Sequence, residues 1–153
     1  MKTLLAVLLC FGLPILASGI GAVASASASE LYAALEQPSW SPPGWVFGPV
    51  WTILYLMMGL AAFLVWRERG WTSVLTFFAV HLIFNALWSW LFFAWRSGAW
   101  SFADIVLLWL MIGALTILFW RIKPLAGVLL SPYWAWVTFA SVLNYDIWRR
   151  NAM

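Results

Sequence analysis

The sequence is organised around the stretch Pro38-Ser39-Trp40-Ser41-Pro42-Pro43-Gly44-Trp45-Val46-Phe47-Gly48-Pro49-Val50-Trp51. It holds four of the seven prolines and three of the fourteen tryptophans. Proline fixes φ, removes a backbone donor and pushes the preceding residue towards an extended conformation. Residues 38–43 therefore cannot lie inside a helix, and we expect a stiff loop between long apolar runs. Two interpretations stay open for it: an interfacial tryptophan belt, or a lid over a cavity.

The composition is that of an integral membrane protein. Of 153 residues, 65% are hydrophobic and 8% are charged, and the mean hydropathy is +0.94, whereas soluble domains carry about 25% charged residues. The net charge of +3 forms no basic cluster, so we expect no nucleic-acid partner. Single copies of cysteine (Cys10) and histidine (His81) exclude an internal disulfide and argue against a metal site.

Apolar runs predict an all-α fold of one domain over residues 1–153, with five transmembrane helices. We place these helices at about 3–24, 46–66, 72–95, 102–120 and 125–148, each close to the roughly 20 residues that span a bilayer. The first run also resembles a signal peptide, but its apolar part is longer than a usual signal core. The long loop, residues 25–44, is expected to contain a short helix over 29–35 that turns Tyr32 inward.

Basic residues give a weak indication of orientation. Five of them fall on the side of the N-terminus and three on the side of the long loop, which weakly favours a cytoplasmic N-terminus. Six tryptophans lie at predicted span ends, where interfacial anchoring explains them better than function does. These are Trp66, Trp71, Trp95, Trp100, Trp120 and Trp148.

Polar side chains inside spans are costly and tend to face protein or a cavity. The third span carries His81, Asn85 and Ser89 on one stripe, with Trp88 one turn from Asn85. By depth, four inward residues can converge in the half of the bundle under the long loop: Trp51, Asn85, Asp104 and Trp136. Flat indoles with a few polar groups suit a flat, mostly apolar ligand. The alternative is helix packing, with Asn85 and Asp104 as interhelical hydrogen-bonding groups.

Other candidate residues are less specific. Leu143, Tyr145 and Arg149 fit a loose cholesterol-contact pattern, although Tyr145 and Arg149 are equally expected as anchors at a helix end. His81 is more simply a packing residue than a metal ligand. We find no carboxylate pair, Ser/His/Asp arrangement or phosphate-binding loop, so nothing indicates hydrolysis or group transfer.

Four motifs together resemble the translocator protein family, also called TspO/MBR, which includes the bacterial tryptophan-rich sensory proteins and the peripheral benzodiazepine receptor. They are Pro38-Ser39-Trp40-Ser41-Pro42-Pro43 in the loop, Phe84-Asn85-Ala86-Leu87-Trp88 in the third span, Pro132-Tyr133-x-x-Trp136 in the fifth, and Leu143-Asn144-Tyr145 near its end. Their order and the five-span plan agree over nearly the whole chain. His81 is a departure, because we expect an amide there in relatives.

The resemblance implies a five-helix bundle that binds porphyrins such as protoporphyrin IX, and isoquinoline carboxamide or benzodiazepine drugs, with cholesterol as a further ligand of animal members. It implies no required cofactor, a homodimer, and for a bacterial-type member the bacterial cell membrane. The implied ligand-binding residues are Tyr32, Trp51, Asn85, Trp88, Asp104, Trp136 and Ala140. The implied sterol motif is Leu143, Tyr145 and Arg149, and the expected lid residues are Pro38, Trp40, Pro42 and Pro43.

Three functional hypotheses follow from the resemblance. The first is a membrane protein that binds tetrapyrroles for handling, transport or stress sensing. The second is an enzyme that degrades porphyrin in light with the indoles of Trp51 and Trp136, and the third is a regulator that acts through a partner protein. Product formation under light distinguishes the second hypothesis from the first.

Overall fold

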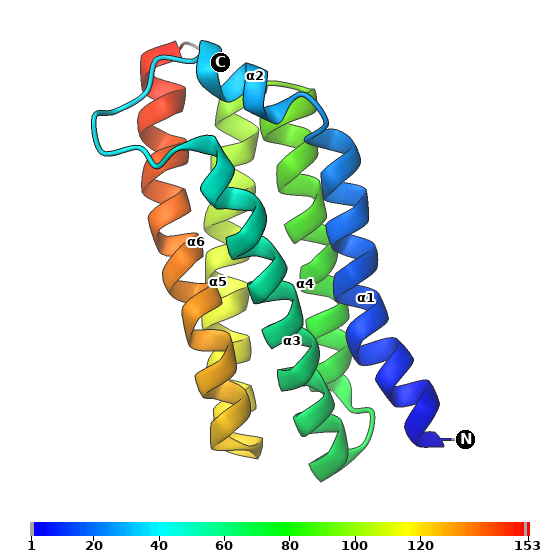
Figure 1. The fold of residues 1–153 in the computed structure, drawn as a ribbon. Helices are drawn as coiled ribbons and strands as arrows, with labels where there is room; N and C mark the ends of the chain where they lie inside the picture. Colours follow the sequence, from blue (N-terminus) through cyan, green and yellow to red (C-terminus); the bar gives the residue numbers. More distant parts are fainter. Residues whose placement is uncertain (1, 152) are drawn as a thin grey trace.

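The computed structural model describes residues 2–151 and 153, which form an elongated bundle of helices (Figure 1). Its elements are α1 (Lys2–Ala24), α2 (Ala28–Ala34), the 3-10 turn η1 (Gly44–Val46), α3 (Phe47–Arg69), α4 (Ser73–Ser89), the π-helical turn η2 (Trp90–Ala94), α5 (Gly98–Ile122) and α6 (Pro124–Asn151). Five helical segments are long and apolar enough to cross a membrane: Lys2–Ala24, Gly44–Arg69, Ser73–Ala94, Gly98–Ile122 and Pro124–Asn151. The all-α, five-span membrane fold is therefore confirmed.

Several helices extend beyond the bounds expected from the sequence. The fourth span begins at Gly98 rather than near 102, and the fifth ends at Asn151 rather than near 148. The second likewise continues to Arg69, past the expected end at Trp66. The expected bounds followed interfacial tryptophans and arginines, but backbone hydrogen bonds close within a helix at any depth in the membrane. Helices consequently continue through the interface until a turn residue stops them, as Gly70 does at φ 69°.

The five long helices form a closed ring that differs from their order in the sequence. α1 packs against α3 and α4, α6 packs against α3 and α5, and α4 packs against α5. In the ring, α1 therefore stands between α3 and α4; these helices are the blue, teal and green ribbons of Figure 1. This order makes α1 one wall of any space between α3 and α4.

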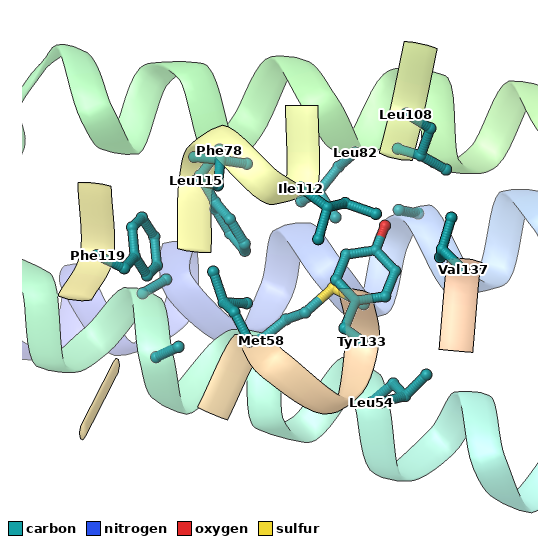
Figure 2. Packing of buried hydrophobic residues seen from close by; sticks show 14 of the residues in the cluster. Leu54, Met58, Phe78, Leu82, Leu108, Ile112, Leu115, Phe119, Tyr133 and Val137 are labelled. Atoms are coloured by element: carbon teal, nitrogen blue, oxygen red, sulfur yellow. The ribbon is translucent and has the colours of Figure 1, made fainter. Parts of the chain in front are cut away.

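The core fills the centre of this ring. Figure 2 shows Met58 of α3, Phe78 of α4, Ile112 and Phe119 of α5 and Tyr133 of α6 packed together, and each is at most 1% exposed. Close helix contact also depends on aromatic rings laid over glycine: a Cβ atom at Gly59 would overlap Phe11, and one at Gly113 would overlap Trp134. Small residues that let helices approach are the usual means of association in lipid.

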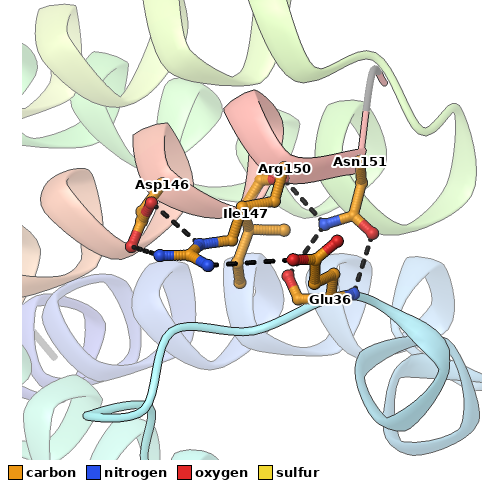
Figure 3. A network of polar contacts seen from close by, with 5 residues as sticks. All are labelled: Glu36, Asp146, Ile147, Arg150 and Asn151. Carbon is orange, nitrogen blue, oxygen red and sulfur yellow. Dashed lines mark hydrogen bonds and ion pairs between the residues drawn. The ribbon is translucent and has the colours of Figure 1, made fainter.

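The long loop is tied to the end of α6 (Figure 3). The Glu36 backbone N–H donates to Oδ1 of Asn151 at 2.8 Å, and Nδ2 of Asn151 donates to the Glu36 carbonyl at 2.9 Å. Arg150 lies 3.8 Å from the Glu36 carboxylate and donates to Asp146 at 3.0 and 3.3 Å. Further along the loop, Trp40 packs edge-on against Phe139 of α6, with ring centroids 5.8 Å apart. The loop is thus held at two places on α6.

Candidate functional site

A cavity of about 390 Å³ lies at the long-loop end of the bundle, between α1, α2, α3 and the junction of α4 with η2. Its lining residues include two groups of different chemistry, which we call the small face and the aromatic face. One face is small and hydroxyl-bearing: Ser18, Gly21, Ala22, Ser25, Ala28 and Ser29. The other is aromatic: Tyr32, Phe47, Trp51, Tyr55, Trp88 and Phe93. None of the lining residues that the structure describes is charged, so the space suits a flat, largely apolar molecule.

Helical spacing explains the aromatic face. Phe47, Trp51 and Tyr55 follow one another at four-residue intervals, so they lie on one side of α3. Trp51 and Tyr55 are tilted by 32° with ring centroids 5.5 Å apart, and Tyr32 meets Phe47 edge-on at 5.3 Å. Trp88 reaches the cavity from the end of α4. These contacts give the cavity a nearly continuous aromatic surface.

The small face is a stripe at the end of α1. Ser18, Gly21 and Ala22 of α1, with Ser25 directly after its end, have the i, i+3, i+4, i+7 spacing of one helix side. A Cβ atom at Gly21 would lie 3.1 Å from Oγ of Ser89, which shows how closely α1 approaches α4 here. Because these side chains are small, they leave open space between α1 and the aromatic rings of the cavity. We call this space the slot.

Hydrogen bonds to the protein fix the rings of the aromatic face. The Tyr32 hydroxyl donates to the Pro42 carbonyl at 3.0 Å, the Tyr55 hydroxyl donates to Oδ1 of Asn85 at 2.5 Å, and Nε1 of Trp88 donates to Oδ1 of Asn144 at 2.8 Å. Each proton is thereby engaged before any ligand enters. The aromatic wall is preformed, which lowers the entropy cost of binding.

Asn85 stands behind this wall and joins three helices. It accepts from Tyr55 of α3 and donates through Nδ2 to the Tyr133 hydroxyl of α6 at 2.9 Å. His81 lies one turn away, with its ring centroid 5.9 Å from that of Tyr133 and its Nδ1 hydrogen-bonded to the Phe78 carbonyl. The arrangement matches the packing role that the sequence left open for Asn85 and His81.

Comparison with known proteins identifies the family. The model of the TspO/MBR family matches residues 6–149. The chain belongs to the TspO/MBR family. It is 40% identical over 155 residues to the tryptophan-rich protein TspO of Chlorobaculum tepidum, with 98% of each chain covered. It is 41% identical to the human translocator protein over 125 residues, which cover 78% of this chain and 74% of the human one. A tryptophan-rich sensory protein of Cereibacter sphaeroides is 40% identical over 122 residues, covering 80% and 77%.

The cavity of this TspO/MBR member includes three of the ligand-binding residues predicted from the sequence: Tyr32, Trp51 and Trp88. Asn85 is one side chain removed from it, behind Tyr55. Asp104, Trp136 and Ala140 lie on α5 and α6, outside the cavity wall. Trp136 packs against Phe47 of the wall, at 5.8 Å between ring centroids. The structure therefore does not bring Trp51 and Trp136 to one shared surface.

The predicted lid residues and sterol motif do not line the cavity, although the Pro42 carbonyl accepts a hydrogen bond from Tyr32 of its wall. Pro38, Trp40, Pro42 and Pro43 belong to the part of the loop before η1, and the roof of the cavity is formed by α2 and Gly44. The sterol-motif residues divide between two faces of α6: Leu143 is buried, whereas Tyr145 is exposed with the Arg149 guanidinium 5.9 Å from its ring.

Sequence reasoning missed the contribution of α1. The pocket predicted from depth used the second to fifth spans, because α1 consists mostly of small and aliphatic residues and, apart from Lys2 at its start, carries no charge or amide. One signal was available: the stripe of Ser18, Gly21, Ala22 and Ser25 is a helix side on which no large residue stands. Among the described residues, no group of three His, Cys, Asp or Glu side chains could hold a metal ion.

Proposed function

We propose that this TspO/MBR member binds a porphyrin such as protoporphyrin IX in the cavity between α1, α2, α3 and α4, and handles tetrapyrroles in its membrane. One observation carries the proposal: an uncharged slot of about 390 Å³ has aromatic rings on one face and small residues on the other. Aromatic faces stack on flat π systems, and the small face leaves room for a flat ring. The volume is within the roughly 300–1,000 Å³ of ligand pockets.

Family membership supports the proposal at a coarser level. The relatives bear the names translocator protein, tryptophan-rich sensory protein and CrtK, and the chain is a multi-pass membrane protein like them. Flat drugs and sterols would have to meet the same requirement for an apolar, uncharged slot. Homodimer formation and placement in a bacterial cell membrane are part of the same proposal.

Trp51→Leu is the variant that tests this binding site. We expect it to weaken protoporphyrin IX binding about tenfold in the dark, because it removes the central ring of the aromatic face, and losing such a contact at about 1.4 kcal/mol corresponds to tenfold in affinity. The matched control is Trp100→Leu, at a tryptophan that is 70% exposed and lies outside the cavity. The measurement is a titration of the porphyrin Soret band in lipid nanodiscs. Equal affinities of the two variants would remove the site.

A second candidate function is light-dependent porphyrin degradation. It is favoured by the place of Trp51, which forms part of the cavity wall and lies 5.5 Å from Tyr55 and 6.1 Å from Tyr133 between ring centroids. A photoexcited porphyrin supplies its own reactivity, and the protein need only hold it against an oxidisable ring. Trp136 lies one aromatic ring further away, behind Phe47.

The indole dependence of the light reaction is the corresponding prediction. Under anaerobic light, Trp51→Phe should keep most porphyrin binding and lose most product formation, while Trp136→Phe should reduce the rate less, because its indole does not line the cavity. The measurement is the product absorption spectrum against time, with free porphyrin as the control for bleaching. Wild-type product at the wild-type rate in both variants would exclude the enzyme and leave the binding protein or the sensor.

A further inference from the structure

The cavity leaves no place for charged groups on its ligand. No charged side chain lines it among the residues described, and burying an unpaired carboxylate at membrane depth is strongly unfavourable. A porphyrin with two propionates, the ligand class of the proposed function, must therefore place its acidic groups at the loop end of the cavity, where water and polar residues are near.

Arg96 is located at the same end of the bundle as the cavity. It follows Phe93 of the aromatic face by three residues in the chain. It lies in the turn between η2 and α5, and Figure 1 shows that turn on the same end of the bundle as α2. Its side chain is exposed. A long arginine side chain of this kind can follow an apolar wall while its guanidinium stays in the interface.

The backbone of Arg96 is in a conformation that normally belongs to glycine. Its φ is 50°, and it is the one non-glycine residue with positive φ in the described part of the chain. The turn at the opposite end, between α3 and α4, has glycine in the equivalent position, Gly70 at φ 69°. Left-handed backbone is unfavourable for a residue with a Cβ atom. Arginine therefore occupies a position where glycine would be less strained, and such strain is common at functional sites.

The π-helical turn η2 connects the aromatic face of the cavity with Arg96. The backbone N–H of Trp95 donates to the Trp90 carbonyl, and the N–H of Ser97 donates to the Leu91 carbonyl, both at 2.8 Å. The wide turn closes α4 directly at the cavity, since Phe93 is part of it, and π-turns occur often at functional sites. Arg96 is the second residue after this turn, directly beyond its C-cap residue Trp95.

The other basic residues at this end are engaged elsewhere. Arg150 is paired with Asp146 and Glu36, and the Arg149 guanidinium lies over the Tyr145 ring on α6. Arg96 has no acidic partner within the described residues. Among the arginines of this end, Arg96 is thus the one that is close in the chain to a cavity-lining residue and is available to an anion.

We propose that Arg96 binds a carboxylate of the flat ligand at the mouth of the cavity and so selects acidic porphyrins over uncharged ones. Guanidinium and carboxylate form charge-assisted, often bidentate hydrogen bonds. The aromatic slot would recognise the ring, and Arg96 would recognise its acidic edge. The inference rests on the proposed porphyrin site and adds a residue that determines which porphyrins bind there.

Two ligands and four variants test the inference in nanodiscs of phosphatidylcholine. The ligands are protoporphyrin IX and its dimethyl ester, which has the same ring without the charges. Arg96→Asn and Arg96→Gly remove the guanidinium and suit left-handed backbone, Arg96→Lys keeps a positive charge, and Arg149→Asn is the matched control. Soret titrations give the affinities, and the melting temperatures of the Arg96 variants should equal or exceed that of the wild type.

Arg96→Asn and Arg96→Gly should weaken protoporphyrin IX binding about tenfold, or about 1.4 kcal/mol, and leave the dimethyl ester unchanged. Arg96→Lys should restore part of the loss, and Arg149→Asn should change neither affinity. Added salt should weaken binding of the acid to the wild type more than to Arg96→Asn. Wild-type affinity for the acid in Arg96→Asn, or equal losses for both ligands, would overturn the inference.

Lipid phosphate is the other anion that Arg96 could bind. Adding an anionic lipid distinguishes phosphate binding from binding of the porphyrin carboxylate. If the guanidinium served phosphatidylglycerol headgroups alone, adding this lipid would raise the stability of wild type over Arg96→Asn, and the two porphyrins would bind both proteins alike. That result would overturn the inference. Failure of the proposed porphyrin site gives a different result from failure of the Arg96 inference. If the site itself is wrong, Trp51→Leu will not change the affinity for either porphyrin, including the uncharged dimethyl ester.

Discussion

Asn85→Leu is expected to lower the free energy of unfolding by about 3 kcal/mol. The substitution deletes two hydrogen bonds at once, from the Tyr55 hydroxyl at 2.5 Å and to the Tyr133 hydroxyl at 2.9 Å. Both hydroxyls would be left without this partner at a buried site between α3, α4 and α6, and each unsatisfied group costs about 1–3 kcal/mol. Denaturation in mixed micelles, followed by tryptophan fluorescence, measures the change.

Tyrosine variants provide the controls for this network. Tyr133→Phe should cost less than Asn85→Leu, because it removes one of the two bonds. Tyr145→Phe should be within about 0.5 kcal/mol of wild type, since Tyr145 is an exposed residue of α6. Hydrogen bonds between membrane helices average only about 0.6 kcal/mol in some measurements. An Asn85→Leu protein as stable as Tyr145→Phe would show that the network does not hold the three helices together.

The sequence was sufficient to predict the fold and part of the site. Apolar run lengths determine the five spans, and four-residue spacing places Trp51 and Tyr55 on one side of α3. The same spacing aligned Asn85 with Ser89 on α4. The two residues nevertheless have different surroundings in the structure. Ser89 lines the cavity, whereas the Tyr55 side chain lies between Asn85 and the cavity. A stripe on one helix does not reveal which neighbouring side chain fills the space in front of it.

The order of helices in the ring could not be predicted in this way. The expected pocket was placed from the depth of inward residues on the second to fifth spans, and depth does not reveal which helices are neighbours. In the structure α1 packs between α3 and α4, so the cavity is bounded by Ser18, Gly21 and Ser25 rather than by Asp104 and Trp136. Lipid provides no hydrophobic drive that would rank alternative helix orders, and the small residues of α1 carry no polar signal of burial.

Gly21→Leu is expected to weaken protoporphyrin IX binding at least tenfold. Gly21 lies on the small face of the cavity, and at its Cβ position the nearest atom is Oγ of Ser89 at 3.1 Å. A serine side chain can shift by a few tenths of an ångström, and the added isobutyl group would then occupy the slot itself. Overfilling a packed site costs about 1–3 kcal/mol, or roughly tenfold and more in affinity. Ser25→Leu fills the same face as an independent variant.

The most direct test of the account is a Soret titration of Gly21→Leu beside Gly19→Leu in the same nanodiscs. Gly19 is on the same helix two residues away, and a Cβ atom there would meet nothing within 4 Å, so it matches the change in helix propensity without filling the cavity. The account predicts that Gly19→Leu binds protoporphyrin IX like the wild type and that Gly21→Leu and Ser25→Leu bind it at least tenfold more weakly. Wild-type affinity in folded Gly21→Leu and Ser25→Leu would contradict it and place the porphyrin outside the α1 wall.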